Sequence, residues 1–346
     1  MPADSRANVE QTYFAEKFGF FFRIDTGWIT PMNNDLSIDV FNRPYLDMMW
    51  YLQGHIVNDT ASVNGMDFTL DSFCYKPISG EGCIVESPMQ YFHDNLTIIQ
   101  SMTNEDIKEL ATCVKPLPGE QRACFDSIGS PVLTFAIFGD TSCENVATEC
   151  DQCKIKAGGM QFTMLLNHNA YSQFTSEEWE RQVFIRNIKS FNYALGNGYH
   201  TDLDGPLEGL NYNWALIHDI QDFIARWKVE HPKEEIVLMK ADYLAERSIQ
   251  DNIVLESSQN ASIVVISYIL MFLYVSIAIG FFPNIIHMKF GLGLVGILVV
   301  IFSLFAGIGL TFYWNQKITM ISFEVVPFLI LAIGVDNMFL ISRAER

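Results

Sequence analysis

Residues 318–342 read ITMISFEVVPFLILAIGVDNMFLIS, and this stretch decides the class of fold. As a helix, its 25 residues are long enough to cross the apolar core of a lipid bilayer, which is about 30 Å thick. Its only charged residues are Glu324 and Asp336. An ionised carboxylate near the bilayer centre costs about 2.5–3.5 kcal/mol on insertion scales, so such groups face a protein interior or a wet cavity. The two acids are therefore candidates for a proton or ion relay.

A buried helix of a soluble protein is the alternative interpretation of this stretch, and two neighbouring segments argue against it. Residues 261–282 read ASIVVISYILMFLYVSIAIGFF, and residues 290–314 read FGLGLVGILVVIFSLFAGIGLTFYW. Neither segment contains a charged residue. Three apolar segments joined by short linkers predict transmembrane helices at 261–282, 290–314 and 318–342, because a helix satisfies its own backbone hydrogen bonds in lipid.

The chain is acidic, with 22 Lys and Arg against 40 Asp and Glu and a formal net charge of -18. Nearly all of this charge lies in the first part of the chain, because residues 261–346 hold only four basic and three acidic side chains. An acidic domain repels phosphate groups, so nucleic acid and anionic membrane surfaces are disfavoured as its partners. The chain therefore divides into an acidic domain, residues 1–260, and a membrane region, residues 261–346.

All seven cysteines precede the first apolar segment, which is typical of disulfides formed in an oxidising compartment. Two pairs are separated by short turn-rich stretches, which predicts the disulfides Cys74–Cys83 and Cys113–Cys124. A zinc site is the alternative, but no histidine lies at ligand spacing from a Cys-X-X-Cys motif. We therefore expect no metal and no cofactor.

The remaining cysteines are Cys143, Cys150 and Cys153, and the sequence does not choose a pair among them. A redox pair of Cys150 and Cys153 requires a strand-to-helix setting, which the surrounding sequence lacks. Because seven is an odd number, one thiol is free or pairs with another chain.

Two N-glycosylation sequons support a luminal or extracellular position for residues 1–260: Asn58-Asp-Thr60 and Asn95-Leu-Thr97. The basic residues agree with this side, because three of the four that follow position 260 then lie in the cytoplasm. Residues 1–7 contain no apolar signal region, so the chain is expected to be part of a longer protein.

The acidic domain has the pattern of an α+β fold. Residues 39–55 carry apolar side chains at helical spacing, whereas residues 159–167 read GMQFTMLLN, an apolar run typical of a buried strand. The expected strands are 19–29, 131–139, 159–167 and 235–240, and the expected helices are 39–55, 177–193, 213–229 and 241–260, the last running into the first apolar segment. This order predicts a split βαβ, ferredoxin-like sandwich.

Motifs along the whole chain carry a family resemblance. They are YFAEKFGFFFR at 13–23, GSPV at 129–132, AERSI at 245–249 and FEVVPFLILAIGVDN at 323–337. They resemble the Niemann-Pick type C sterol transporter family, which forms a wider group with Patched and the bacterial resistance-nodulation-division pumps. The resemblance implies that residues 1–260 are a middle luminal domain and that 261–346 hold the first three helices of a sterol-sensing domain. It also implies an integral membrane protein of endosomes, lysosomes or the plasma membrane.

The function that the resemblance implies is transport of a sterol or related lipid from the lumen to the membrane. In the family, the helix that contains Glu324 and Asp336 is proposed to sense or relay protons. The two acids are 12 residues apart, about 18 Å of helical rise, so they do not pair directly. Burial pushes a carboxyl group towards its neutral form, which suits a response to acidic pH. A structural acid bonded to a neighbouring helix is the alternative role.

A sterol groove needs an apolar wall with a polar end. The candidates for such a groove are Ser267, Tyr268, Tyr274, Ser276, Pro327 and Asn337. The first four place hydroxyl groups among apolar side chains, and the proline is expected to kink its helix and open room beside it. An ordinary helix-packing face is the alternative interpretation of the four hydroxyl-bearing residues, and a tolerated membrane proline is the alternative for Pro327.

Two other functions stay open: a Patched-like sterol-binding signalling receptor, and a sterol-sensing scaffold without transport. No enzyme is predicted, because the sequence has no Ser/His/Asp arrangement, phosphate-binding loop or zinc pattern. The resemblance further implies a soluble sterol-carrier protein that docks on two luminal loops bearing aromatic residues. The corresponding segments here, 31–39 and 103–112, are short and contain no aromatic residue, which leaves docking of a carrier open.

Overall fold

The computed structural model describes most of the acidic domain and part of the membrane region. The described residues are 22–76, 82–110, 132–143, 155–167, 173–196, 209–232, 239–256 and 290–314, apart from positions 34, 36, 250 and 254, with single positions in 6–17, 126–129, 263–274 and 325–340. The chain forms two compact units. One is Phe18–Ser248, and the other combines Met1–Lys17 with Ile249–Arg346.

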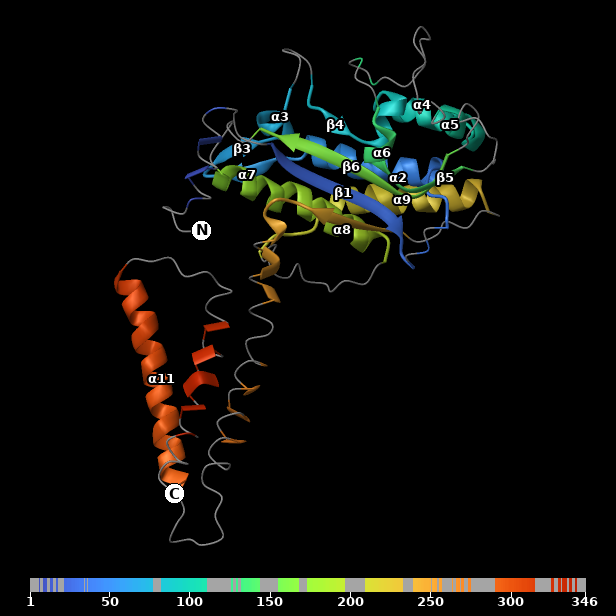
Figure 1. The fold of residues 1–346 in the computed structure, drawn as a ribbon. Helices are drawn as coiled ribbons and strands as arrows, with labels where there is room; N and C mark the ends of the chain where they lie inside the picture. Colours follow the sequence, from blue (N-terminus) through green and yellow to red (C-terminus); the bar gives the residue numbers. More distant parts are fainter. Residues whose placement is uncertain are drawn as a thin grey trace. The chain divides into compact units, whose positions relative to one another are not determined.

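An antiparallel sheet organises the unit Phe18–Ser248 (Figure 1). Its strands are β1 (Arg23–Pro31), β4 (Val85–Glu86), β5 (Phe138–Cys143), β6 (Ile155–Leu166) and β7 (Met239–Leu244). β1 lies between β6 and β7, while β4 and β5 both pair with the other edge of β6. The order β5–β6–β1–β7, with every pairing antiparallel, agrees with the split βαβ order expected from the sequence.

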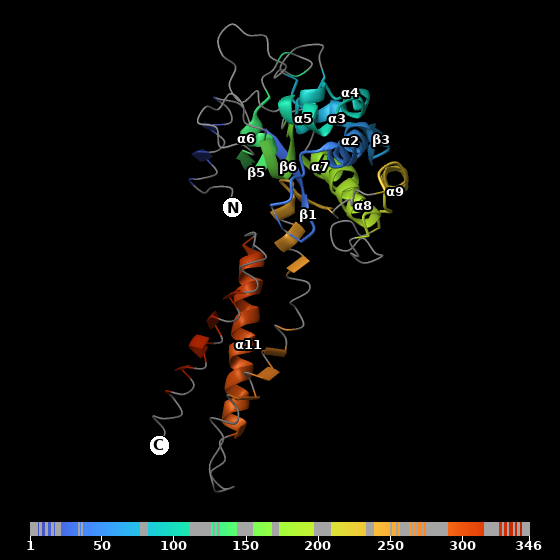
Figure 2. The same cartoon turned by 90° about the vertical axis from the view of Figure 1, so that its right-hand side faces the viewer.

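Helices cover one side of this sheet, as Figure 2 shows. They are α2 (Arg43–Asn58), α7 (Gln173–Trp179), a π-helical turn (Glu180–Ile185), α8 (Arg186–Ala194) and α9 (Trp214–Glu230). α2 buries apolar side chains three to four residues apart, which are Leu46, Met49, Leu52 and Ile56. Along β1 the burial alternates, so Arg23, Asp25 and Ile29 all face the core. The predicted helices 39–55, 177–193 and 213–229 are therefore present.

Shorter elements complete this unit. They are the β2–β3 hairpin (Ala61–Val63 and Met66–Phe68), α3 (Leu70–Phe73), a 3-10 helix (Pro88–Phe92), α4 (Leu96–Ser101), α5 (Asn104–Leu110) and α6 (Thr134–Ile137). The hairpin turns at Asn64 and Gly65, whose φ angles are 53° and 77°. Asparagine and glycine are the residues that this turn geometry favours, because both tolerate the left-handed region.

Two predicted elements are wrong in part. Residues 134–137 of the predicted strand 131–139 are helical, and the strand begins only at Phe138. Residues 241–244, predicted as the start of a helix, belong to β7 and pair with β1. Both errors concern short apolar runs, whose periodicity does not separate a helix from a strand until the pairing partner is known.

In the other unit, α11 (Phe290–Tyr313) coincides with the second predicted apolar segment. Described positions within 263–274 and 325–340 are also helical. Counting only residues that the structure describes, no helix is both long enough and apolar enough to cross a membrane. The three transmembrane helices remain a prediction.

Candidate functional site

The GVDN motif lies against α11 through its glycine. A β-carbon added to Gly334 would lie 2.6 Å from Cγ2 of Val300, so glycine permits this close approach of the Gly334 backbone to the Val300 side chain. Asp336 and Asn337 follow on helical, exposed positions. The structure thus places one predicted acid two residues from a close helix–helix contact, whereas Glu324 lies outside the described residues.

The predicted groove residues are only partly described. Tyr268, Ser276 and Pro327 lie outside the described residues. The Ser267 hydroxyl donates a hydrogen bond to the Ile263 carbonyl at 2.9 Å, and Tyr274 is 68% exposed. No described contact joins either side chain to Asp336 or Asn337, so a shared groove stays a prediction.

The predicted disulfide Cys74–Cys83 is present. It joins the end of α3, where Cys74 also bridges to Leu166 of β6, to the segment before β4. The thiols of Cys113, Cys124, Cys150 and Cys153 lie outside the described residues. Both sequon asparagines, Asn58 and Asn95, are exposed.

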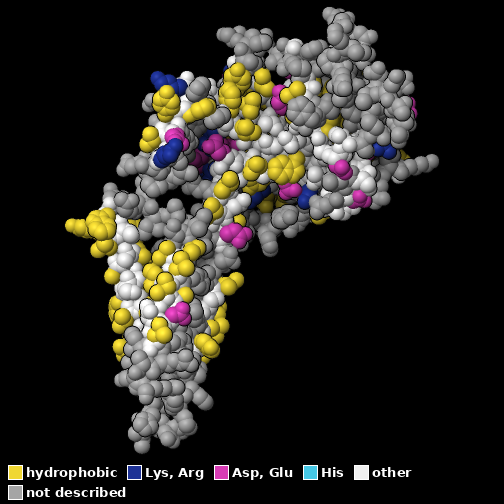
Figure 3. All heavy atoms as spheres, in the orientation of Figure 1, with side chains coloured by type: hydrophobic (Ala, Val, Ile, Leu, Met, Phe, Trp, Pro, Cys, Tyr) yellow, Lys and Arg dark blue, Asp and Glu magenta, His cyan; other side chains and the backbone are white. Residues whose placement is uncertain are grey.

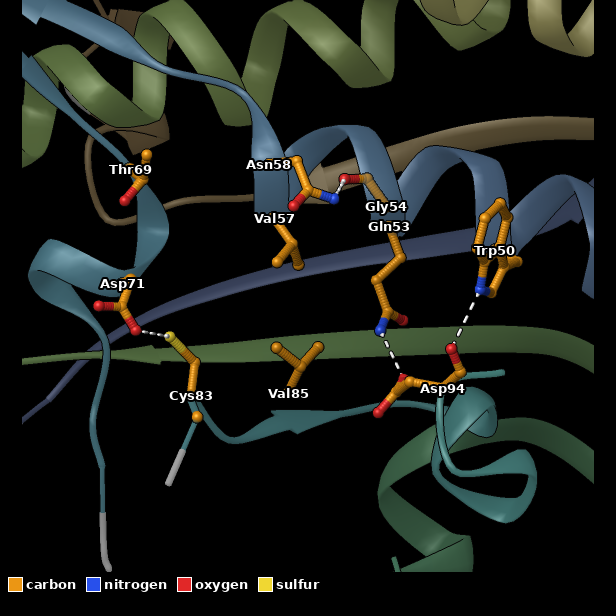
Figure 4. A pocket seen from close by; sticks show the side chains of 11 residues that line it. Trp50, Gln53, Gly54, Val57, Asn58, Thr69, Asp71, Cys83, Val85 and Asp94 are labelled. Carbon is orange, nitrogen blue, oxygen red and sulfur yellow. Dashed lines mark hydrogen bonds between the residues drawn. The ribbon is translucent and has the colours of Figure 1, made fainter. Parts of the chain in front are cut away.

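A cavity opens beside this disulfide, on one face of α2 (Figure 4). Its volume is about 490 Å³, and its walls come from α2, the segment around Asp71 and Cys83, β4 and the turn at Asp94. Gln53 Nε2 donates to Asp94 Oδ1 at 3.1 Å, and the Trp50 indole N–H donates to the Asp94 carbonyl at 3.3 Å. Gln53 Oε1 is buried without a hydrogen-bond partner. The sequence indicated no site here, although the Asn58 sequon lies in the same wall.

A second polar cluster is buried between β1 and the π-helical turn. Arg23 Nε donates to Glu180 Oε1 at 2.7 Å, and both side chains are almost fully buried. Arg23 also lies 3.3 Å from Glu246, which is half exposed. The Arg247 amide donates to Glu180 Oε2 at 3.3 Å, and its guanidinium donates to the Glu177 carbonyl at 2.5 Å. The AERSI motif therefore ties the end of the sheet to this cluster.

Two buried carboxyl groups of this cluster, Asp25 and Glu180, have raised pKa values. Burial, followed by the nearby Glu180 charge, raises the pKa of Asp25 well above its ordinary value, and Arg23 only partly offsets this. The Glu246 amide lies close by and lowers the pKa slightly, but neither Asp25 oxygen accepts a hydrogen bond of normal geometry. Burial also raises the pKa of Glu180, against the opposing pull of Arg23.

The buried Asp47 on α2 predicts that the stability of the folded domain depends on pH. Burial raises its pKa to about 6, although Arg43 and Arg226 act in the opposite direction. Between about pH 4 and 6 the folded state then binds more protons than the unfolded state, so the free energy of unfolding falls as pH rises. We expect Asp47→Asn to remove about 2–3 kcal/mol of this dependence. Denaturant unfolding followed by tryptophan fluorescence measures it, and parallel pH profiles for the two proteins would contradict it.

Two known protein families match this chain, each over a different region. Residues 11–197, more than half of the chain, match the family described as "NPC1, middle luminal domain". The chain belongs to the NPC1 family. Residues 285–346, which include α11 and Asp336, match the family described as "Sterol-sensing domain of SREBP cleavage-activation". The family model names the first of these regions as luminal, in agreement with the side predicted from cysteines and sequons.

Members of the NPC1 family match nearly the whole chain. The identity is 27% over 380 residues with NPC intracellular cholesterol transporter 1 of Sus scrofa, which covers 99% of this chain and 26% of the relative. NPC intracellular cholesterol transporter 1 homolog 1b of Drosophila melanogaster is 26% identical over 365 residues, covering 97% and 25%. Protein patched homolog 1 of Caenorhabditis elegans is 37% identical over 106 residues, covering 30% and 8%. The chain spans about a quarter of the length of the NPC1 relatives.

Proposed function

We propose that this chain is a segment of a membrane sterol transporter, with a luminal α+β domain and the first helices of a sterol-sensing domain. The observation that carries the proposal is the sterol-sensing match over residues 285–346, which includes Asp336 and the close contact of Gly334 with Val300. Transporter names among relatives that match 97–99% of the chain support it.

The surface of the region 249–346 fits a lipid or helical environment. Large apolar side chains on α11 are exposed, among them Phe302, Phe305 and Phe312 at 69%, 64% and 62%. Figure 3 shows hydrophobic side chains on the surface of the unit that contains α11. Exposure of so many neighbouring aromatic rings to water is unfavourable, whereas lipid tails or further membrane helices would cover them. This supports transmembrane positions for 261–282, 290–314 and 318–342.

The proposal includes a response of the transporter to protons and a direction of sterol movement. Asp336 and Glu324 would respond to luminal pH, and sterol would move from the lumen to the membrane. Burial raises the pKa values of Asp25, Asp47 and Glu180, so protonation of these three carboxyl groups favours the folded domain at acidic pH. A soluble carrier is not included, because Met32 is the one large apolar side chain exposed among the described residues of 31–39 and 103–112.

A Patched-like sterol receptor is the second candidate. The match to protein patched homolog 1 has the higher identity, 37%, but covers only 30% of the chain. The luminal domain, which matches the NPC1 family over 11–197, therefore favours the transporter.

Sterol labelling tests the proposal. In the complete protein, a photoactivatable sterol is expected to label the segments near Tyr274 and Pro327, located by mass spectrometry. We expect Ser276→Trp to reduce labelling by about tenfold, because a bulky ring fills the space that a sterol would occupy. Ser303→Trp on α11 is the matched control and is expected to change nothing. Labelling by phospholipid probes alone, with none by sterol, would contradict the proposal.

A further inference from the structure

The cavity on α2 has a glycosylation sequon in its wall, and this placement gives the cavity an occupant. We propose that the cavity seats the first N-acetylglucosamine units of a glycan attached to Asn58. The sugar would lie along α2 from Asn58 over Gly54 to Trp50. The inference requires only a luminal domain and is independent of sterol transport.

The geometry of α2 places three of the cavity residues in one line along the helix, which we call the track. Trp50, Gly54 and Asn58 are spaced four residues apart, so they form one stripe on α2, and all three line the cavity (Figure 4). A β-carbon added to Gly54 would meet no atom within 4 Å, so the space over the middle of the stripe is open. The cavity volume of about 490 Å³ lies within the range of small-ligand pockets, roughly 300–1,000 Å³.

The Asn58 side chain is compatible with a glycan in the folded protein. Its Nδ2 donates to the Gly54 carbonyl at 2.7 Å, and this bond uses one of its two hydrogens. In glycosylation, Nδ2 attacks C1 of a lipid-pyrophosphate-linked oligosaccharide. The N–C bond forms, the C–O bond to pyrophosphate breaks, and one amide proton leaves with the transferase base. The remaining hydrogen keeps the bond to Gly54, which would direct the sugar along the helix.

The chemistry of the walls suits an acetylated sugar. Gln53 is 6% exposed, and its Oε1 has no hydrogen-bond partner although it lines the cavity. That oxygen is itself closed off from solvent, so the polar groups within reach of a sugar are the Thr69 hydroxyl and the carboxylates of Asp71 and Asp94, which accept from an acetamido N–H or a sugar hydroxyl. The Trp50 indole, held by its bond to Asp94, offers an aromatic surface for the C–H face of a sugar ring.

The charge of the walls argues against anionic occupants. Asp71 and Asp94 are the carboxylates among the lining residues, and no lining residue is basic; Lys76, outside the lining, pairs with Asp71 at 2.6 Å, which leaves Asp94 as the carboxylate that opposes an anion. A phosphate or sialic acid would be repelled, whereas sugar hydroxyls donate to carboxylates. Val57 and Val85 supply the apolar part of the wall.

Enzymatic deglycosylation tests whether the cavity holds the first sugars of the Asn58 glycan. The complete glycoprotein is treated under native conditions with an amidase that cleaves the bond between asparagine and sugar. Cleavage converts the asparagine to aspartate, so mass spectrometry reads each site separately. We expect cleavage at Asn58 to be at least about tenfold slower than at Asn95, the factor that one net hydrogen bond and one stacking contact supply. After denaturation, both sites are expected to react equally.

Two variants distinguish binding of the glycan in the cavity from other causes of slow cleavage at Asn58. Trp50→Ala removes the stacking surface, and Gly54→Leu fills the track. We expect each to raise the native rate at Asn58 to that at Asn95 without changing the Asn95 rate, which serves as the folding control. An unoccupied Asn58, equal native rates at both sites in the unaltered protein, or protection that persists in both variants would each overturn the proposal.

Discussion

Replacing Asp336 by asparagine is expected to leave folding and glycosylation intact and to abolish the pH dependence of sterol transport in the complete protein. Asparagine keeps the shape and hydrogen bonding of the side chain but does not ionise, so the change separates charge from packing. Removing a carboxylate from the membrane would also stabilise the helix by up to a few kcal/mol on insertion scales. A flux assay normalised to folded protein, across about pH 4.5–7.5, measures the effect.

A purely structural acid gives the opposite result. If Asp336 only bonds a neighbouring helix, Asp336→Asn lowers expression, and transport per folded molecule stays unchanged at every pH. Glu324→Gln is the graded control, because the predicted topology places Glu324 closer to the luminal end of its segment, so we expect it to have the weaker effect. Unchanged pH dependence in Asp336→Asn would end the proton hypothesis.

Replacing Arg23 by methionine is expected to destabilise the luminal domain by about 3–5 kcal/mol at neutral pH, because Glu180 and Asp25 lose the cation that compensates their burial. Arg23 is 2% exposed and Glu180 is fully buried, so water does not substitute for the lost partner. Hydrogen exchange of the β1 and β6 amides in the complete protein measures the loss, since these strands open only with the core.

The expected loss is smaller at acidic pH. The pKa values of Asp25 and Glu180 are already raised, so their folded-state protonation contributes stability at low pH that is lost as pH rises. Arg23→Met/Glu180→Gln is expected to recover part of the loss at neutral pH. Lys240→Met is the matched control, because its partner Asp242 is 48% exposed and such pairs contribute only about 0–1 kcal/mol. Equal losses in the Arg23 and Lys240 variants would refute this account.

Local patterns in the sequence were enough for much of the architecture. The apolar spacing in 39–55 and 213–229 predicted α2 and α9, and the apolar run 159–167 predicted β6. Burial periodicity is written into consecutive residues, so the prediction of these elements required no knowledge of their distant partners. The Cys74–Cys83 disulfide was predictable for the same reason, because it closes a short loop.

The GVDN and AERSI motifs identified the family, but not what their residues contact. The structure shows that Gly334 lies against Val300 and that Arg247 bonds Glu180, contacts which no local pattern encodes. The sequence also misplaced residues 134–137 and 241–244, because a short apolar run becomes a strand only when a neighbouring strand pairs with it.

The sequence by itself thus determined the antiparallel α+β domain, the apolar segments with their two acids, the short-range disulfide and the family. Only the tertiary structure decided which polar groups meet. Arg23 and Glu180 are 157 residues apart, and Gln53 and Asp94 are 41 apart. Such pairs depend on how the helical layer sits on the sheet. Their burial, which raises the pKa values and leaves Gln53 Oε1 without a partner, exists only after the chain has closed around them.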